Sequence, residues 1–379
     1  MFYSQFPLAD TTVQRIINPE LHSFYAQTIQ KLMKITSYSE NRFPASNPVS
    51  CLRKDLRDIR NSRNIVPWFA TEKSDGVRFF LVLTCSPQKD PIALLVDRSW
   101  GIFILPGLTF STNLFISGTI LDTELICERP SAEEQSLLGS RPTLWLLLAF
   151  DLLVASGEAL LKAPFLERYS ALQSVLSNHY KPKVGVDVCL VRSKKFVPLV
   201  QLPWLVNEIH NNLRHDNDGL ILQNGHSVYT PGMQKTVLKW KQKEKHTVDF
   251  LCHSIQQVKP EQWMVDLFVL DSAMQLVRAI QIVVSRSNCQ QLGLNDVVEL
   301  DMAILECYWN DRHGWRPLKL RQDKAEPNTE FTLRKTQENI EENIRLEELL
   351  ELATTVEPSL PPVVEALDED LASVLDEFS

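Results

Sequence analysis

The residues best suited to covalent chemistry lie between Lys73 and Arg78, where the sequence reads KSDGVR. A lysine amine attacks phosphorus only when it is unprotonated, so a site that uses Lys73 must exclude water or gather positive charge around it. Gly76 allows a tight turn, and Arg78 would follow within reach of the same phosphate or base. The motif is short, however, and it also suits a surface hairpin with a solvated lysine and an Asp-Gly turn.

Five later segments carry further candidate residues in a fixed order. They are LLVDRSWGIFIL with Arg98, LDTELI with Glu124, LLLAFDLLVASG with Phe150, HDNDGLIL with Asp218, and VLKWKQK with Lys239 and Lys241. Each has a structural alternative: a charge at a strand end, a solvent-facing acid, a core aromatic residue, a plain Asp-Gly turn, or a solvated basic face. Their joint order over about 170 residues favours function over these alternatives.

This series of motifs resembles the covalent nucleotidyltransferases, which comprise mRNA capping guanylyltransferases and polynucleotide ligases. The resemblance covers roughly residues 40 to 330 and implies that Lys73 forms a covalent adduct with a nucleoside monophosphate. It implies the following further roles: Arg98 binds the ribose, Glu124 binds the ribose hydroxyls or helps hold the lysine and a metal, Phe150 stacks on the base, Asp218 serves the metal and the catalytic lysine, and Lys239 and Lys241 grip the α-phosphate. Thr123 departs from the family pattern, which usually has glycine there.

Three features resemble capping enzymes more than ligases. These are the connector RFPASNPVSCLRKDL, the LKWK form of the phosphate element, and the last motif, ECYWNDRHGWRPLKLRQDKAEPNT. In capping enzymes the last motif closes an OB-fold domain onto the nucleotide, which implies GTP-binding roles for Arg321, Asp323 and Lys324. Lys319 stands where the family has arginine; it keeps the charge but loses the bidentate fork.

The resemblance implies a reaction in two steps. Lys73 takes GMP from GTP with the help of Mg²⁺ or Mn²⁺, and the GMP then passes to a 5′-diphosphate RNA end. Ser74, and with it Asp75, would contact the GTP, and the Ser74 hydroxyl could help to reject adenine. A separate RNA triphosphatase and the phosphorylated C-terminal tail of RNA polymerase II are the implied partners, and the nucleus is the implied location. An ATP-dependent ligase and an inactive RNA-binding scaffold of this fold remain alternatives.

Hydrophobic patterning predicts the elements that position these residues. Strands are expected at 79–85, 92–98, 118–126 and 144–154, and helices at 12–33, 164–179 and 202–213. The proline-containing connector over 42–56 should be extended. Further short strands are expected at GLILQ and TVLKWK, and several more between 247 and 320, including one that begins at VVEL.

We therefore predict an α+β protein with a nucleotidyltransferase domain built on antiparallel sheets, followed by an all-β OB-fold domain and a C-terminal helix with an acidic tail. The expected ranges are 1–245, with a helix and connector over 1–64, then 246–329, 330–352 and 353–379. The net charge of -8 is uneven, because residues 337–379 hold thirteen acidic residues and one basic residue. The remainder carries about four more basic than acidic residues. Neither a secretory signal nor a membrane span is expected.

Overall fold

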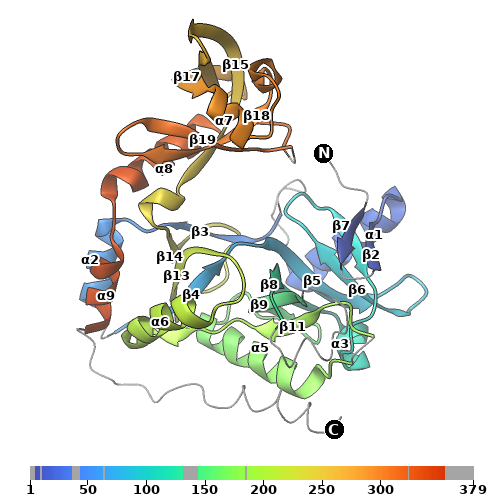
Figure 1. Ribbon diagram of the computed structural model, residues 1–379. Coiled ribbons are helices and arrows are strands. Elements are labelled where there is room, and N and C mark those ends of the chain that lie inside the picture. The colour runs from blue at the N-terminus through green and yellow to red at the C-terminus, as the bar shows by residue number, and fades with distance from the viewer. Residues whose placement is uncertain are drawn as a thin grey trace.

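Three β-sheets form the framework of the protein in the computed structural model, which describes residues 5–8, 11–35, 43–62, 65–130, 144–183, 186–322 and 324–354. The protein is a mixed α/β structure made mostly of sheet, as predicted, with a separate C-terminal domain (Figure 1). None of the described helices is long and apolar enough to span a membrane. The predicted acidic tail from residue 355 onward and Asp323 lie outside the described residues.

The largest sheet has nine strands in the order β1-β2-β7-β6-β5-β8-β9-β10, with β11 pairing parallel to β9 and all other pairs antiparallel. Its strands are β1 (Gln5–Leu8), β2 (Thr11–Arg15), β5 (Val77–Cys85), β6 (Pro91–Val96), β7 (Ile102–Leu105), β8 (Thr119–Glu128), β9 (Leu144–Ala155), β10 (Glu158–Ala159) and β11 (Leu190–Ser193). The central strands β5, β6, β8 and β9 confirm the four strands predicted between 79 and 154.

A second sheet of five strands runs in the order β12-β4-β13-β14-β3, with only β3 and β14 parallel among these pairs. Its strands are β3 (Ser46–Ser50), β4 (Trp68–Ser74), β12 (Val197–Pro198), β13 (Asn217–Asn224) and β14 (Gly232–Trp240). The lysine of the KSDGVR motif lies near the end of β4, and Arg78 lies on β5 in the first sheet. The motif therefore crosses from one sheet to the other.

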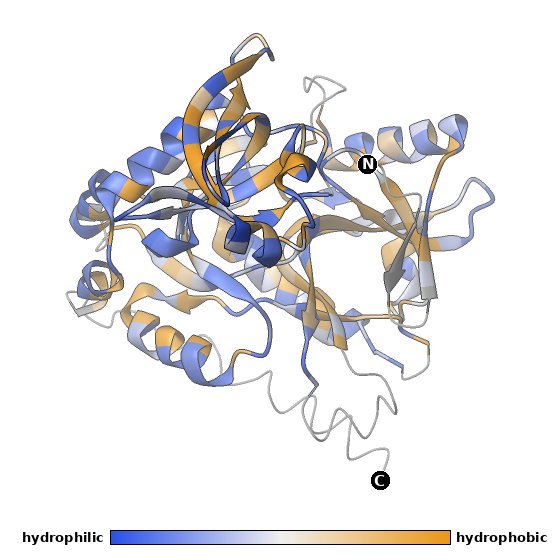
Figure 2. Ribbon diagram, turned by 45° about the horizontal axis from the view of Figure 1, so that its top comes forward, coloured by the Kyte–Doolittle hydropathy of each residue, from blue (hydrophilic) through white to orange (hydrophobic). Residues whose placement is uncertain are grey.

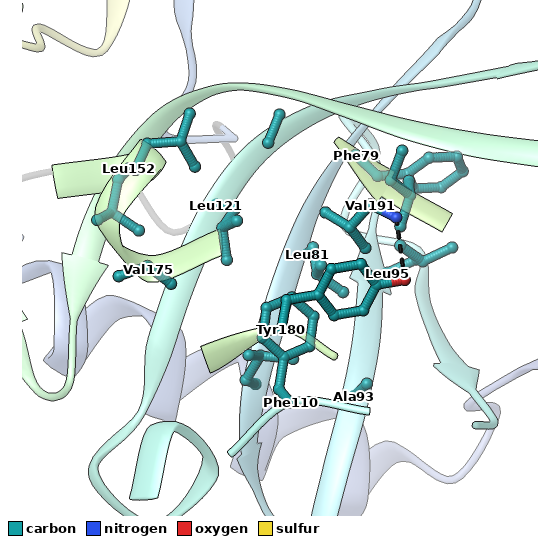
Figure 3. Packing of buried hydrophobic residues seen from close by; sticks show 14 of the residues in the cluster. Phe79, Leu81, Ala93, Leu95, Phe110, Leu121, Leu152, Val175, Tyr180 and Val191 are labelled. Carbon is teal, nitrogen blue, oxygen red and sulfur yellow. Dashed lines mark hydrogen bonds between the residues drawn. The ribbon is translucent and has the colours of Figure 1, made fainter. Parts of the chain in front are cut away.

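Helices cover the faces of these two sheets. They are α1 (Pro19–Met33), α2 (Arg53–Ser62), α3 (Thr112–Ser117), α5 (Phe165–His179), the 3₁₀ helix η1 (Leu199–Gln201) and α6 (Leu202–Asn212). One face of the first sheet packs against α5 in a cluster where the rings of Phe110 and Tyr180 stack with centroids 4.6 Å apart (Figure 3). In the same cluster, the backbone N–H of Val191 donates to the Tyr180 hydroxyl at 3.2 Å. Such burial of apolar surface is the main source of stability for the framework.

The C-terminal domain is built on an antiparallel sheet in the order β17-β16-β15-β18-β19. Its elements are η2 (Lys243–Lys245), β15 (Thr247–Lys259), β16 (Gln262–Leu270), β17 (Leu276–Ser285), α7 (Arg286–Gln291), η3 (Val297–Leu300), β18 (Ile304–Asn310) and β19 (Gly314–Leu320). In Figure 1 this domain stands at the top of the view. Figure 2 shows that the strands of this domain carry many hydrophobic residues.

Two helices, not one, follow the C-terminal domain: α8 (Glu330–Glu342) and α9 (Leu346–Thr354). The predicted single helix over 330–352 was wrong, because Asn343 ends α8 in the left-handed conformation (φ 43°), which asparagine tolerates better than most residues. Leu333 of α8 packs in the C-terminal core, whereas Leu349 of α9 packs in the core of the second sheet. The pair therefore joins the two parts of the protein.

Three other predicted boundaries were wrong. The helix expected over 12–33 begins only at Pro19, because Pro19 occupies the first turn and the Asn18 side chain accepts from the backbone N–H of Leu21 at 2.9 Å. The connector over 42–56 is extended only at β3 and turns into α2 at Arg53. The expected strand at VVEL is the 3₁₀ helix η3, since the Asp296 side chain caps its first turn.

Candidate active site

Lys73 projects toward Asp218, which belongs to the neighbouring strand β13. Its Nζ lies 2.6 Å from Oδ1 of Asp218, and both side chains are largely buried. Asp218 sits at an irregularity in the pairing of β4 with β13, where Gly219 adopts φ +153°. A Cβ at Gly219 would lie 1.9 Å from the carbonyl oxygen of Trp240, so only glycine fits after the aspartate. The Asp-Gly pair thus places a carboxylate beside Lys73.

Two lysines of the VLKWKQK segment approach the same carboxylate from β14 and the residue after it. Lys241 forms an ion pair with the second oxygen of Asp218. The pKa of Asp218 is lowered, because these two ion pairs outweigh the opposing effect of burial. Lys239 has no ion pair with any residue the structure describes, and desolvation, together with the charges of Lys241, Lys73 and Arg98, lowers its pKa to about 8. Three cationic side chains therefore gather around one carboxylate.

A pocket of about 150 Å³ opens beside Lys73. Its lining includes Arg98 from the turn after β6, Glu124 from β8 and Phe150 from β9. Burial raises the pKa of Glu124, although the cations around it act in the opposite direction. The structure therefore brings these three predicted residues to the same pocket as the lysine. Ile221 of β13 also lines the pocket, and sequence reasoning missed it because it reads as an ordinary strand residue.

Ser74 is buried and belongs to a polar network at the same pocket. Its hydroxyl donates to Glu72 at 2.9 Å and accepts from Lys194 Nζ at 2.7 Å. Lys194, only 7% exposed, also pairs with Glu72 at 3.1 Å. Sequence reasoning missed Lys194, which lies in no recognisable motif; a charged residue beside the apolar pair Phe196 and Val197 was the only signal.

Behind this network, His215 joins two buried glutamates. Its Nδ1 lies 3.0 Å from Glu128, and its Nε2 lies 3.4 Å from Glu72. Burial alone would lower the pKa of His215, but the hydrogen bond with Glu128 and the nearby carboxylate of Glu72 raise it to about 9. Lys194 and His215 in turn hold the pKa of Glu72 below its usual value, against the effect of burial. His215 was part of the predicted Asp218 segment, yet no role was assigned to it.

Arg78 does not lie free beside the pocket. Its Nε donates to Asp122 at 2.8 Å, its second guanidinium nitrogen pairs with the same carboxylate at 2.5 Å, and a third donates to the carbonyl of Ser46 at 2.7 Å. Tyr229 donates to Asp122 at 2.7 Å. The guanidinium also lies 5.3 Å from the centroid of the Phe150 ring, and Arg78 and Phe150 both line the pocket.

Asp75 and Gly76 lie in the turn between β4 and β5. Both are exposed, whereas the Lys73 side chain is largely buried. Asp75 is exposed, and its backbone N–H donates to the carbonyl of Asp216 at 2.9 Å. Gly76 does not adopt a positive φ, so its requirement is steric rather than conformational. A Cβ there would lie 2.5 Å from the carbonyl oxygen of Leu125 on β8. Gly76 thus allows β8 to pass close to the lysine strand.

The cations of the last motif lie in the C-terminal domain and form ion pairs there. Arg321 contacts Asp249 at 3.2 Å and Glu306 at 3.4 Å, and Lys324 also pairs with Asp249. Lys319 lies 3.4 Å from Glu306 and is 63% exposed. These ion pairs are all with acids of the C-terminal domain itself.

The charged oxygens of the pocket suit a hard divalent cation. Mg²⁺ typically binds one or two carboxylates together with substrate phosphates. Glu124 makes no ion pair within the described part of the chain, and Asp218 is held between two lysines, so both are oxygen donors of the right kind. No cluster of three or more His, Cys, Asp or Glu side chains that could hold a metal occurs among residues 5–354 where these are described.

Comparison with known proteins gives a consistent result. The family model for the mRNA capping enzyme catalytic domain matches residues 10–243, and that for the mRNA capping enzyme C-terminal domain matches residues 232–350. The mRNA-capping enzyme subunit alpha of Schizosaccharomyces pombe is 27% identical over 344 residues, covering 84% of this chain and 82% of that protein. That of Neurospora crassa is 25% identical over 370 residues, covering 87% and 89%.

Among solved structures, a mycobacterial DNA ligase D complexed with ATP and MES aligns with a TM-score of 0.38 and 16% identity, covering 75% of this chain and 96% of that one. The two family models together span most of the sequence and define it as a nucleotidyltransferase. The chain belongs to the mRNA capping enzyme family. Its capping-enzyme domains indicate guanylyltransferase activity, which confirms the predicted class of enzyme.

Proposed function

We propose that Lys73 is the nucleophile that takes GMP from GTP. Its amine nitrogen forms a bond to the α-phosphorus, the bond from that phosphorus to the bridging oxygen breaks, and pyrophosphate leaves. Lys73 reacts as the neutral amine, and the proton that its nitrogen sheds when the nitrogen–phosphorus bond forms passes to water, which leaves a neutral phosphoramidate nitrogen. The observation that carries this proposal is that Lys73, which lines the pocket, contacts Asp218, and that Asp218 in turn holds Lys241 and lies within the electrostatic reach of Lys239.

The surrounding side chains have distinct proposed tasks. Asp218 fixes the direction of the Lys73 amine, while Lys239 and Lys241 neutralise charge that develops on the α-phosphate. Arg98 and Glu124 serve the ribose. Phe150 offers its ring to the base, because it lies at the pocket with one side supported by the Arg78 guanidinium.

Guanine selection is proposed to depend on the polar network at Ser74. Guanine presents an oxygen acceptor at its six-position, where adenine presents an amino donor. Lys194 can only donate, and it already lies 2.7 Å from the Ser74 hydroxyl in the pocket lining. If Ser74 and Lys194 both donate to the guanine oxygen, adenine leaves these two donors without an acceptor. ATP would therefore bind less favourably than GTP.

Glu124 and Asp218 would hold Mg²⁺ or Mn²⁺ together with the phosphates. When bound, such an ion supplies positive charge to the phosphate oxygens.

The C-terminal domain, which we propose to be an OB-fold over 246–329, would bring Arg321, Asp323 and Lys324 to the pyrophosphate. Arg321 and Lys324 would then exchange Asp249 for phosphate oxygens.

The acceptor in the second step is proposed to be a 5′-diphosphate RNA end. A separate triphosphatase would produce it, since relatives of this chain are named as subunits of a capping enzyme. Docking on the phosphorylated tail of RNA polymerase II and nuclear residence belong to the same proposal.

The test uses α-³²P-labelled GTP or ATP with a divalent metal, followed by denaturing electrophoresis. We expect label from GTP alone, none in Lys73→Ala, and normal labelling in Lys235→Ala, which removes an exposed lysine of β14. Label from ATP alone would identify a ligase instead. For the second step, cap formation on 5′-diphosphate RNA but not on 5′-triphosphate RNA would support a separate triphosphatase.

A further inference from the structure

The turn between β18 and β19 carries a second pocket, which the proposed chemistry does not use. It has a volume of about 430 Å³ and is lined by residues of the turn and of η2: Lys243, Glu244, Tyr308, Trp309, Arg312 and His313, together with Asn310 and Asp311. Aromatic rings interleaved with cationic side chains are typical of surfaces that bind single-stranded nucleic acid.

Trp309 is held in a fixed orientation at this pocket. Its ring meets Trp315 edge-on, with centroids 5.6 Å apart and an interplanar angle of 77°, and its indole N–H donates to Asp311 at 3.1 Å. Trp315 is itself buried at 4% exposure. A half-buried ring fixed in this way can stack on a base with little loss of side-chain freedom.

The pocket lining holds two cations, Lys243 and Arg312, and two acids, Glu244 and Asp311, so its formal charge is balanced and the cation at its exposed tip is Arg312. The Asp311 carboxylate lies 2.6 Å from Lys243, so its charge is locally compensated. Arg312 and the imidazole of His313 are exposed at the tip of the turn, where the guanidinium of Arg312 can contact a phosphate and the ring of His313 can hydrogen-bond to one. Cations in such positions contact phosphates without reading sequence.

The pocket also lies near the proposed reaction site. Lys243 follows Lys241 by two residues, which separates their Cα atoms by at most about 7 Å. Tyr308 and Glu306 share a face of β18, because residues two apart on a strand point to the same side. Glu306 forms an ion pair with Arg321, one of the cations of the last motif. The pocket is therefore close to both the phosphate lysines and the cations of the last motif.

We propose that this pocket binds the acceptor RNA, with one base near the 5′ end stacked on Trp309 and its phosphates against Arg312 and His313. This inference rests on the proposed function, because it assigns a place to the second substrate of that reaction. The contact is sequence-tolerant, since every base presents a face that can stack.

The experiment compares the two half-reactions in Trp309→Ala of the full chain. Lysine–GMP formation from GTP should stay within about two-fold of wild type, because no RNA takes part. Transfer of GMP to a 5′-diphosphate RNA of about ten nucleotides should fall about ten-fold in kcat/KM, whereas transfer to a 5′-diphosphate mononucleotide should not change. Trp309→Phe, which keeps a ring, should recover most of the loss.

Two variants control this test. Trp204→Ala removes another partly exposed tryptophan, on α6 beneath Lys195, and should leave transfer to the long acceptor unchanged. Arg312→Glu, at an exposed position, should weaken transfer to the long acceptor. This variant replaces Trp309→Ala as the test if Trp309→Ala folds poorly.

Equal losses on the long and short acceptors, or long-acceptor transfer within two-fold of wild type in both Trp309→Ala and Arg312→Glu, would overturn the proposal. A wild-type protein that forms no adduct with GTP would instead refute the proposed function.

Discussion

The Nζ of Lys73 lies 2.6 Å from the Oδ1 of Asp218, and the second oxygen of the same carboxylate holds Lys241. One acid thus fixes the positions of two cations from different strands. Because Gly219 is required for the close approach of β13 to β14, the position of this carboxylate is set by the backbone and not only by its ion pairs.

Asp218→Asn should slow lysine–GMP formation about 100-fold, the scale of loss expected when a reacting group is displaced by about 1 Å. The amide keeps the shape of the side chain but removes the charge that orients both lysines. Single-turnover labelling with GTP measures this effect. Asp216→Asn, an exposed neighbour in the same segment, is the matched control and should react normally. Normal labelling in Asp218→Asn would show that the ion pair with Lys73 has no role in positioning it.

Lys239 predicts a pH dependence in the same reaction. Its pKa of about 8 means that the free enzyme loses this charge as the pH rises through 8, which weakens the grip on the α-phosphate. Arginine stays charged throughout this range. The ratio of kcat/KM for Lys239→Arg to that of wild type should therefore rise about three-fold or more between pH 7 and pH 9. A ratio that stays constant over this range would mean that Lys239 is charged throughout or does not contact the phosphate.

The sequence predicted the parts of this site that lie within short motifs. Lys73, Asp218, Lys239 and Lys241 each belong to a segment with a recognisable pattern, and the structure brings them together. The central strands were also predicted, because long runs of branched apolar residues favour buried strands.

Contacts with residues that were not assigned a role in any motif could not be predicted. Arg78 was expected near the phosphate or base, but its partner Asp122 is 44 residues away and gives no local signal. The same holds for His215, whose carboxylate partners lie on β4 and β8. The helices predicted over 164–179 and 202–213 agree with α5 and α6 to within one residue at each end, whereas the start of α1 and the end of α8 were missed because they depend on the single capping residues Asn18 and Asn343.

The buried ion pair of Arg78 with Asp122 predicts a stability effect larger than any effect on binding. Asp122 is 0% exposed, so Asp122→Ala leaves a buried guanidinium without its carboxylate and should lower the free energy of unfolding by about 3–5 kcal/mol. Chemical denaturation measures this loss. The double variant Arg78→Met with Asp122→Leu should recover much of it, because no charge is then left unpaired. If the single variant unfolds like wild type, the pair is not a major stabilising contact.

His215 predicts a stability that falls as the pH rises. Its folded pKa of about 9 exceeds the ordinary value of 6.5, so the contribution is complete below pH 6.5 and is lost as the pH rises through 9. His215→Gln keeps hydrogen-bonding groups for Glu72 and Glu128 but cannot titrate. Relative to this variant, wild type should lose about 1–2 kcal/mol of unfolding free energy between pH 6.5 and pH 9, a figure reduced for solvent screening. Parallel pH profiles for the two proteins would mean that the pKa of His215 is not raised in the folded state, and that Lys194 and Ser74 hold Glu72 in place without a charge on the imidazole.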